Sequence, residues 1–248
     1  RIWLAGRDDV FCLHPDSIPS SGVFSMNANK AFIHQNLSNV RSLYFDSEKK
    51  NILIGTQNHG LYEISIGAGT DLYNAPVRNY YAEPGKVGAL QSNFITTIIR
   101  TQEGDLWLGT ESGGFCKMVE SNDTVHFISY GESEGLISNV VKAIEEDMEG
   151  NLWISTNVGL TQFQPGREEF FLFNSEDGYR DNFFETTSAS MANGTLVFGG
   201  VYGLCIVNPS KITVRENYPP FHLGGFELFN REVHPGDTID NNVLLDQP

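Results

Sequence analysis

A short motif recurs five times along the chain, and this recurrence constrains the fold more than any other feature of the sequence. Each copy places an apolar run before a small residue, and a turn and a second apolar run follow. The small residues are 50, 54, 46 and 44 residues apart: Ala5, Gly55, Gly109, Ser155 and Gly199. Because recurrence at this period indicates one supersecondary unit built several times, we interpret the chain as a tandem repeat.

A second motif accompanies the first, since an asparagine precedes four of the five small residues. These asparagines lie 16, 16, 16 and 17 residues before them: Asn39, Asn93, Asn139 and Asn182. Asparagine favours turns because its side chain can hydrogen-bond to the nearby backbone. We therefore interpret the four asparagines as turn residues at the start of each unit.

Within one unit the apolar pattern is that of short strands. Residues 140–147, 152–156, 160–163 and 169–173 are predicted strands, joined by turns rich in Gly, Asn and Asp. Four antiparallel strands repeating at 44 to 54 residues are typical of a β-propeller blade. We predict an all-β propeller with almost no helix, in which the second strands of five blades are 2–5, 52–56, 106–110, 152–156 and 196–199.

The repeat also accounts for the tryptophans and cysteines. All three tryptophans lie two residues before a small residue: Trp3, Trp107 and Trp153. A large aromatic residue at one strand position of each unit is expected to fill the space between neighbouring blades. All three cysteines follow the apolar residue after the second turn: Cys12, Cys116 and Cys205. Since equivalent positions on different blades do not approach closely enough for a disulfide, we expect three unpaired thiols.

Charge and composition exclude several classes of function. The chain has 31 acidic and 16 basic residues, and its formal charge of −15 disfavours binding to nucleic acid or to an anionic membrane surface. No stretch approaches the roughly 18 apolar residues that span a bilayer. The N-terminal residues lack the apolar segment and cleavage site of a signal peptide and resemble the inside of a strand. We therefore expect the chain to be a fragment of a longer protein.

Motifs for catalysis and metal binding have little support. The sequence GESEG at 131–135 matches the nucleophile elbow formally, but it lies in a blade connection with no predicted helix after it. The six histidines show no metal-binding spacing, and the cysteines form no C-x-x-C motif. No acidic pair stands out as a glycosidase pair among the 31 acidic residues. We therefore expect no catalytic residue, no metal and no cofactor.

The combination of N-x-(V/I), D-x-x-G-x-L-W-(I/L)-(G/S)-T and G-L resembles the two-component regulator propeller repeat. That repeat occurs in the extracytoplasmic sensor region of hybrid two-component systems of Bacteroidetes. The resemblance is best around 90–120 and 136–165, and it is good at 37–65, where Leu53 replaces the tryptophan. The segment YPPFHLGGFELFNREVHPGD at 218–237 resembles the start of the Ig-like Y_Y_Y domain that follows these propellers.

The resemblance implies a domain organisation. We expect residues 1–215 to form part of a propeller of roughly seven blades, of which five are recognisable here. Residues 216–248 would then begin the Ig-like β-sandwich.

The resemblance also implies a function. It predicts a periplasmic, non-catalytic sensor domain of an inner-membrane protein that carries a histidine kinase domain and acts as a homodimer. An oligosaccharide from carbohydrate breakdown would be the ligand, and the signal would regulate transcription of polysaccharide-utilisation genes. Two alternatives stay open, namely a lyase or glycosidase on a propeller scaffold and a dimerisation scaffold with the ligand bound elsewhere.

Propeller geometry limits where such a ligand could bind. Because the chain reverses at each turn, the turn between second and third strands lies on the same rim as the segment leading into the first strand. Residues on these turns differ from blade to blade, which fits either a ligand-specific surface or unconstrained loops. The candidate ligand-binding residues on this rim are Arg7, Asp8, Gln57, Asn58, His59, Glu111, Asn157 and Tyr202.

Overall fold

The computed structural model describes most of the chain between residues 39 and 212 and shorter segments on either side. The described residues are 2–5, 10–13, 31–32, 37, 39–66, 75–83, 85–121, 124–173, 184–212, 226–228, 231–233, 238–239 and 242–243. They belong to two compact units, Arg1–Ile212 and Thr213–Pro248, and each unit is described by itself.

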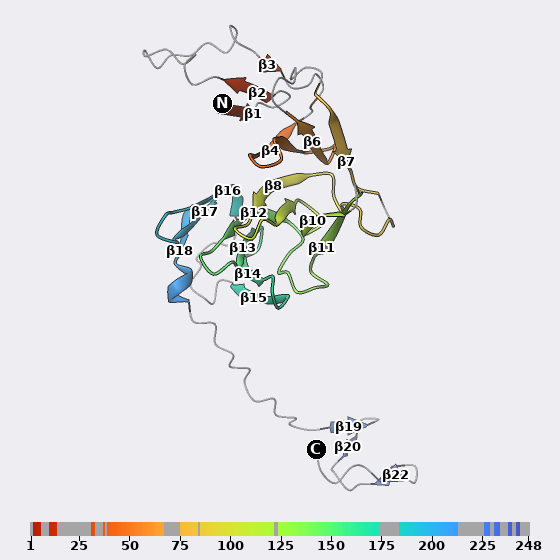
Figure 1. Ribbon diagram of the computed structural model, residues 1–248. Helices are drawn as coiled ribbons and strands as arrows, with labels where there is room; N and C mark the ends of the chain where they lie inside the picture. Colours follow the sequence, from red (N-terminus) through yellow and green to blue (C-terminus); the bar gives the residue numbers. More distant parts are fainter. Residues whose placement is uncertain are drawn as a thin grey trace. The chain divides into compact units, whose positions relative to one another are not determined.

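The first unit is built from a series of antiparallel sheets, each of which is one blade (Figure 1). Three blades have four strands, in the orders β4-β5-β6-β7, β8-β9-β10-β11 and β12-β13-β14-β15. Two more show three strands each, β1-β2-β3 and β16-β17-β18. Strands that follow one another in the sequence are neighbours in every sheet. The predicted β-propeller fold is therefore confirmed.

The strand bounds follow the repeat. The first strands are β4 (Val40–Asp46), β8 (Ile95–Arg100), β12 (Val141–Glu146) and β16 (Phe184–Ser190). The second strands are β1 (Ile2–Ala5), β5 (Asn51–Thr56), β9 (Leu106–Thr110), β13 (Leu152–Thr156) and β17 (Leu196–Gly200). The third strands are β2 (Val10–Leu13), β6 (Leu61–Ser65), β10 (Phe115–Ser121), β14 (Leu160–Gln164) and β18 (Gly203–Val207). The fourth strands are β3 (Ala31–Phe32), β7 (Val77–Tyr80), β11 (Thr124–Tyr130) and β15 (Glu169–Phe173).

The second strands agree with the predicted ranges to within one residue at either end. The only helix in the described part of the chain is a single 3-10 turn, η4 (Pro209–Lys211). Over the same residues, no helix is long and apolar enough to cross a membrane.

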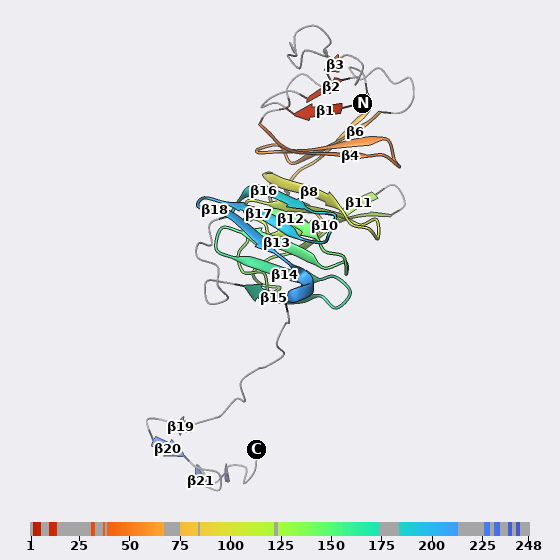
Figure 2. The same ribbon diagram turned by 90° about the vertical axis from the view of Figure 1, so that its left-hand side faces the viewer.

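The first strands line the inner side of the blades. Strands β4, β8, β12 and β16 contact one another in succession (Figure 2). Each second strand also contacts the first strand of the following blade, as β5 contacts β8 and β9 contacts β12. The apolar core therefore consists of layers between consecutive blades rather than of one central cluster.

Two tryptophans fill these layers, as predicted. Trp107 is 1% exposed, and its ring lies 5.9 Å from that of Tyr130 and 5.8 Å from that of Phe163 in the next blade. Trp153 is fully buried, stacks on Phe173 at 5.3 Å and packs in a cluster with residues of β16 and β17. The side chain of Trp3 lies outside the described residues.

The two buried indoles differ in their hydrogen bonding. Trp153 Nε1 donates to Asp147 Oδ2 at 2.8 Å, whereas Trp107 Nε1 is buried without a partner among the described residues. In the sequence, Thr101 stands six residues before Trp107, where Asp147 stands six residues before Trp153. One blade therefore lacks the acceptor that its neighbour provides.

The cysteines behave as the repeat alignment predicts where they are described. Cys116 and Cys205 are free thiols. Burial raises the pKa of Cys116 to about 12 and that of Cys205 to about 11. The side chain of Cys12 lies outside the described residues.

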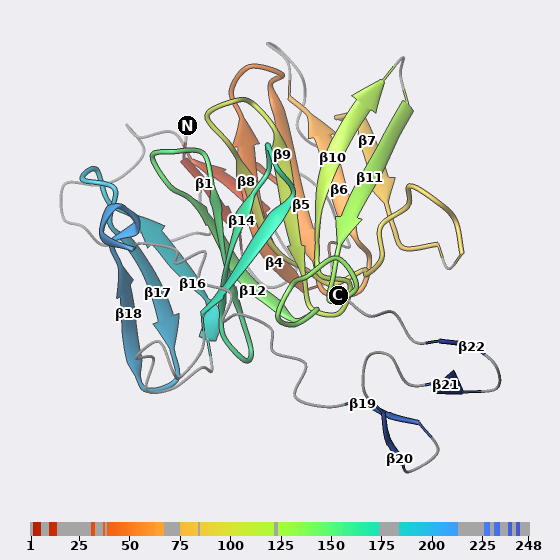
Figure 3. The same ribbon diagram turned by 90° about the horizontal axis from the view of Figure 1, so that it is seen from below.

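The last blade exposes one of its faces. Leu204 and Ile206 on β18 are 70% and 67% exposed, whereas Cys205 and Val207 alternate with them and pack toward Trp153. No strand of the described residues pairs with the outer edge of β18 (Figure 3). Within the described residues, this blade therefore has an unpaired edge at β18 and two exposed apolar side chains on one face.

The second unit contains two short hairpins. Strand β19 (Phe226–Leu228) pairs with β20 (Arg231–Val233), and β21 (Thr238–Ile239) pairs with β22 (Asn242–Val243). The Ig-like sandwich predicted for 216–248 stays a prediction.

Candidate functional site

A threonine at the end of the second strand organises the turn that follows it. Its hydroxyl donates to a glycine carbonyl across the turn, and a backbone amide of the turn donates back to the hydroxyl. The pairs are Thr56–Gly60 at 2.9 Å, Thr110–Gly114 at 2.8 Å and Thr156–Gly159 at 2.9 Å. All three threonines are at most 1% exposed. The buried threonines therefore hold the backbone of the turns between second and third strands in place, while the residues at the tips of these turns differ between blades.

Each of two turns is also tied to the next blade. The Gly60 amide donates to the Asn93 carbonyl, and the Gly114 amide donates to the Asn139 carbonyl, both at 3.0 Å. The φ angles of these glycines are 73° and 68°, and a Cβ at either would lie 2.1 Å from a backbone oxygen of the fourth strand. Only glycine fits there. The turn and the lead-in segment of the next first strand therefore share one rim, as predicted.

The side chains of Asn93 and Asn139 hold the connection between blades. Asn93 Oδ1 accepts from the Ala82 amide at 2.7 Å, and Asn139 Oδ1 accepts from the Glu132 amide at 2.9 Å. Both donors lie just after a fourth strand. The interpretation of these two asparagines as turn residues is therefore confirmed.

Asn39 matches the other asparagines in spacing but not in structure. Its φ is 53°, and its carbonyl accepts from the Gln57 amide at 2.9 Å, a contact that Phe94 makes with Glu111 in the next blade. Counted from the partner of the small residue, the hairpin between β4 and β5 (Ser42 to Gly55) is one residue longer than that between β8 and β9 (Thr97 to Gly109). The lead-in from the asparagine to that partner is correspondingly one residue shorter. The predicted equivalence is therefore wrong for Asn39, and Asn182 lies outside the described residues.

In three blades the first strand begins with a β-bulge on this rim. In β4, β8 and β12 the ladder skips a single residue, and the bulged residues are Arg41, Thr96 and Lys142. A bulge leaves its extra residue unpaired, bends the strand and re-aims the side chain. Three polar residues therefore stand at one position of successive inner strands, beside the turns.

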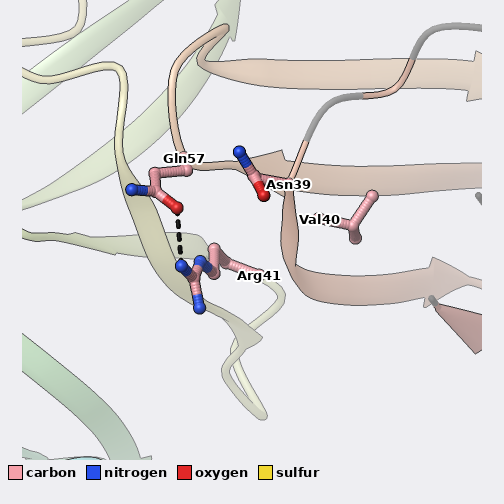
Figure 4. Close-up of a pocket in the computed structure, with 4 residues that line it drawn as sticks. All are labelled: Asn39, Val40, Arg41 and Gln57. Atoms are coloured by element: carbon pink, nitrogen blue, oxygen red, sulfur yellow. Dashed lines mark hydrogen bonds between the residues drawn. The ribbon is translucent and has the colours of Figure 1, made fainter. Parts of the chain in front are cut away.

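Arg41 stands beside a hollow of about 350 Å³, and the described residues that line it are Asn39, Val40, Arg41 and Gln57 (Figure 4). Its Nη2 donates to Gln57 Oε1 at 2.5 Å. Its guanidinium carbon lies 5.3 Å from the ring centroid of Phe94, which belongs to the lead-in of the next blade. The guanidinium is thus positioned by contacts with two blades.

Lys142 connects two blades in a different way. Its Nζ lies 3.0 and 3.1 Å from the two carboxylate oxygens of Glu111, on the turn of the preceding blade. The two side chains are 17% and 33% exposed, so the ion pair is partly shielded from solvent. On the following turn, Asn157 Oδ1 accepts from the Ser138 hydroxyl at 2.8 Å. These rim residues are therefore already engaged in inter-residue contacts.

Six of the eight predicted ligand-binding residues are described, and they lie on four successive turns. They are Gln57, Asn58 and His59 after β5, Glu111 after β9, Asn157 after β13 and Tyr202 after β17. Gln57 lines the hollow, whereas Tyr202 lies on the last turn and is 74% exposed. Arg7 and Asp8 lie outside the described residues. The structure therefore places the six in corresponding turns but does not gather them into one pocket.

Sequence reasoning missed Arg41 and Lys142. Both lie at the start of a first strand, two and three residues after an asparagine of the repeat. The available signal was a polar side chain within a mostly apolar run, recurring at Arg41, Thr96 and Lys142. Only the ladder register shows that these residues are equivalent, because the asparagine spacing misaligns the first of them by one residue.

The described residues offer little for catalysis. In GESEG, the Ser133 hydroxyl donates to Glu134 at 2.7 Å, the Gly131 amide donates to the same carboxylate, and a strand rather than a helix follows. This segment is therefore not a nucleophile elbow. No group of three or more His, Cys, Asp or Glu side chains in the described residues could hold a metal ion.

Parts of two blades match a known protein family. Residues 89–112 and 135–158 match the family described as two component regulator propeller. Each stretch runs from before the first strand to the turn after the second strand, in the blades β8–β11 and β12–β15. The fold is therefore a β-propeller in which two four-stranded blades match this family over their first two strands.

Three proteins illustrate the similarity. Histidine kinase P4 of Formosa agariphila is 26% identical over 198 residues, which are 79% of this chain and 14% of the kinase. The extracellular domain of BT3049 from B. thetaiotaomicron, assigned to a hybrid two component system, is 24% identical with a TM-score of 0.64 over 94% of this chain and 31% of that one. Virginiamycin B lyase of Staphylococcus aureus is 13% identical with a TM-score of 0.53, covering 83% and 61% of the two chains. The chain thus spans less than a third of the first two proteins.

Proposed function

We propose that this chain is a non-catalytic, extracytoplasmic sensor domain within a longer hybrid two-component protein. The observation that carries the proposal is the coincidence of the two family matches with two complete blades, within a region similar to a histidine kinase over 79% of the chain. The longer protein would contribute the membrane anchor and the kinase, and it would act as a periplasmic homodimer. Fold alone would not support this function, because propellers serve many.

The proposed ligand is an oligosaccharide released from a polysaccharide, bound at the rim that carries the turns after the second strands. Sugars are well solvated, so each hydrogen bond adds only about 0.5–1.5 kcal/mol net. Useful affinity therefore needs several partners held in place beforehand. Buried threonines and contacts with neighbouring blades restrain these turns. The signal would regulate transcription of genes for polysaccharide use.

The test is calorimetric titration of the chain with defined oligosaccharides. The variant His59→Ala/Glu111→Gln/Tyr202→Ala should weaken a ligand of the parent chain at least tenfold while leaving the melting temperature nearly unchanged. Glutamine replaces Glu111 because it still offers Lys142 an acceptor. A matched variant on exposed turns of the opposite rim, Gln102→Ala/Glu149→Gln/Met191→Ala, should bind normally. Undiminished binding by the first variant would move the site off this rim and favour a scaffold role.

An enzyme on the same scaffold is the second candidate, because virginiamycin B lyase shares the fold. The purified chain should be incubated with polysaccharides, and the products should be followed by chromatography. A sensor domain binds without turnover, whereas a lyase or glycosidase releases new chain ends. Catalytic release would overturn the sensor proposal.

A further inference from the structure

The surroundings of Arg41 differ from those of most other cations that the structure describes. Six lysine or arginine side chains pair with a carboxylate: Lys49–Glu120, Lys86–Glu83, Arg100–Asp46, Lys117–Asp105, Lys142–Glu111 and Arg167–Glu169. Arg41 donates instead to the neutral amide of Gln57, and no carboxylate of the described residues pairs with it. In a chain with a formal charge of −15, acidic partners are abundant. Despite that excess, no carboxylate among the described residues compensates the positive charge at this hollow.

The guanidinium is also held in a defined place. It belongs to a bulged residue, bonds to Gln57 and lies over the ring of Phe94. Guanidinium carries five N–H donors in a planar fork, and the Gln57 bond uses one of them. The remaining donors make no hydrogen bond with the described residues. A positioned cation with unused donors is suited to a planar or tetrahedral anion, which it can bind through two hydrogen bonds.

The hollow beside Arg41 has room for a small group. Its volume of about 350 Å³ lies at the lower end of the range of roughly 300–1,000 Å³ for small-molecule sites. Its described lining residues come from the lead-in and start of the first strand and from the turn after the second strand, which are parts of the rim proposed to bind the ligand. We propose that this hollow receives the anionic group, a carboxylate or a sulfate ester, of an acidic oligosaccharide, with Arg41 as its partner. The inference rests on the proposed function and adds the class of ligand.

A second hollow shows what an unsuitable site looks like. It has a volume of about 470 Å³, and its cations are Lys49, Arg100 and Lys117. Each of them already pairs with a carboxylate. An anion there would have to displace an existing partner, whereas Arg41 has no partner among the described residues other than a neutral amide.

The negative charge of the chain does not prevent such binding. Charges separated by more than about 8 Å are largely screened at physiological ionic strength. The anion is therefore governed by the groups nearest to it, of which Arg41 is one. Screening of the remaining attraction predicts that affinity for the acidic ligand falls as salt is added.

The experiment compares charged and neutral forms of the same sugar. Trigalacturonate and its fully methyl-esterified counterpart test the carboxylate, and a sulfated disaccharide and its desulfated counterpart test the sulfate. Each is titrated into the chain, into Arg41→Gln and into Arg167→Gln, which removes an exposed arginine of the opposite rim. Arg41→Lys serves as the variant that keeps the charge but loses the planar fork. Melting temperatures establish that all variants are folded.

We expect at least one acidic probe to bind at least tenfold more tightly than its neutral counterpart. Arg41→Gln should abolish that difference, Arg167→Gln should preserve it, and Arg41→Lys should give an intermediate affinity. Acid binding that is indifferent to Arg41→Gln would overturn the inference. If neutral sugars bind and no acidic probe does, the inference is wrong while the sensor proposal stands. If no sugar of either kind binds, both are contradicted.

Discussion

Trp107 and Trp153 are equivalent in the repeat, equally buried and different in one hydrogen bond, which makes them a matched pair for a stability experiment. Replacing tryptophan with phenylalanine removes the indole N–H, and it removes the same side-chain volume at both sites. At Trp153 the change removes the bond of 2.8 Å to the Asp147 carboxylate, which is 3% exposed. At Trp107 the change removes a buried donor that has no partner among the described residues.

The expected difference follows from these two environments. A hydrogen bond to a charged group contributes about 1.5–3 kcal/mol, and an unsatisfied buried donor costs about 1–3 kcal/mol. Trp153→Phe should therefore lower the free energy of unfolding by about 3 kcal/mol more than Trp107→Phe does. For a protein of this size each kcal/mol shifts the melting temperature by roughly 2–4 °C. The two variants should thus melt roughly 6–12 °C apart.

Urea unfolding followed by far-UV circular dichroism measures the difference, and calorimetry gives the melting temperatures. Asp147→Thr supplies the control, because it places in this blade the residue that precedes Trp107 in the other. In that background Trp153→Phe should behave like Trp107→Phe. If Trp107→Phe destabilises the chain as much as Trp153→Phe, the reasoning from the missing acceptor is refuted.

Two further predictions concern ionisation. Burial raises the pKa of Cys116 to about 12 and that of Cys205 to about 11. In the folded Cys12→Ser variant these two thiols should therefore react slowly with Ellman's reagent at pH 8, and both should react once urea unfolds the protein. Rapid reaction of both thiols under native conditions would contradict this prediction. Burial raises the pKa of Glu145 above its ordinary 4.5, although hydrogen bonds from Ser188 and Ser190 act to lower it. The folded state therefore holds this proton more tightly than the unfolded state does, and the protein loses stability as pH rises through the raised pKa. Glu145→Gln should therefore raise the free energy of unfolding at pH 7 relative to the parent and change it little at pH 4. Urea unfolding measures both values, and an equal effect at the two pH values would show that the charge is not the cause.

The fold was predictable because its determinants are periodic. Second strands could be placed from the small residue and the tryptophan before it, and the structure agrees to within one residue at either end. The error at Asn39 has a physical cause. A hairpin longer by one residue and a lead-in shorter by one residue cancel in the sequence spacing, so equal spacing conceals a different ladder register.

The candidate site was less predictable than the fold. The rim could be derived from chain reversal at each turn, but the bulges that single out Arg41 and Lys142 are properties of strand pairing. The contact of Lys142 with Glu111 joins residues of two blades, and side-chain direction decides it. Gln57 was predicted as a rim residue, whereas its partner Arg41 was overlooked.

The exposed face of the last blade has a practical consequence for solution studies of this chain. A strand edge without a partner among the described residues and two exposed aliphatic side chains, Leu204 and Ile206, form the kind of surface through which copies of a protein associate. We expect concentration-dependent self-association of the isolated chain, and Leu204→Lys should suppress it in sedimentation velocity runs. A dimer that persists in that variant is the one worth comparing with the homodimer proposed for the longer sensor.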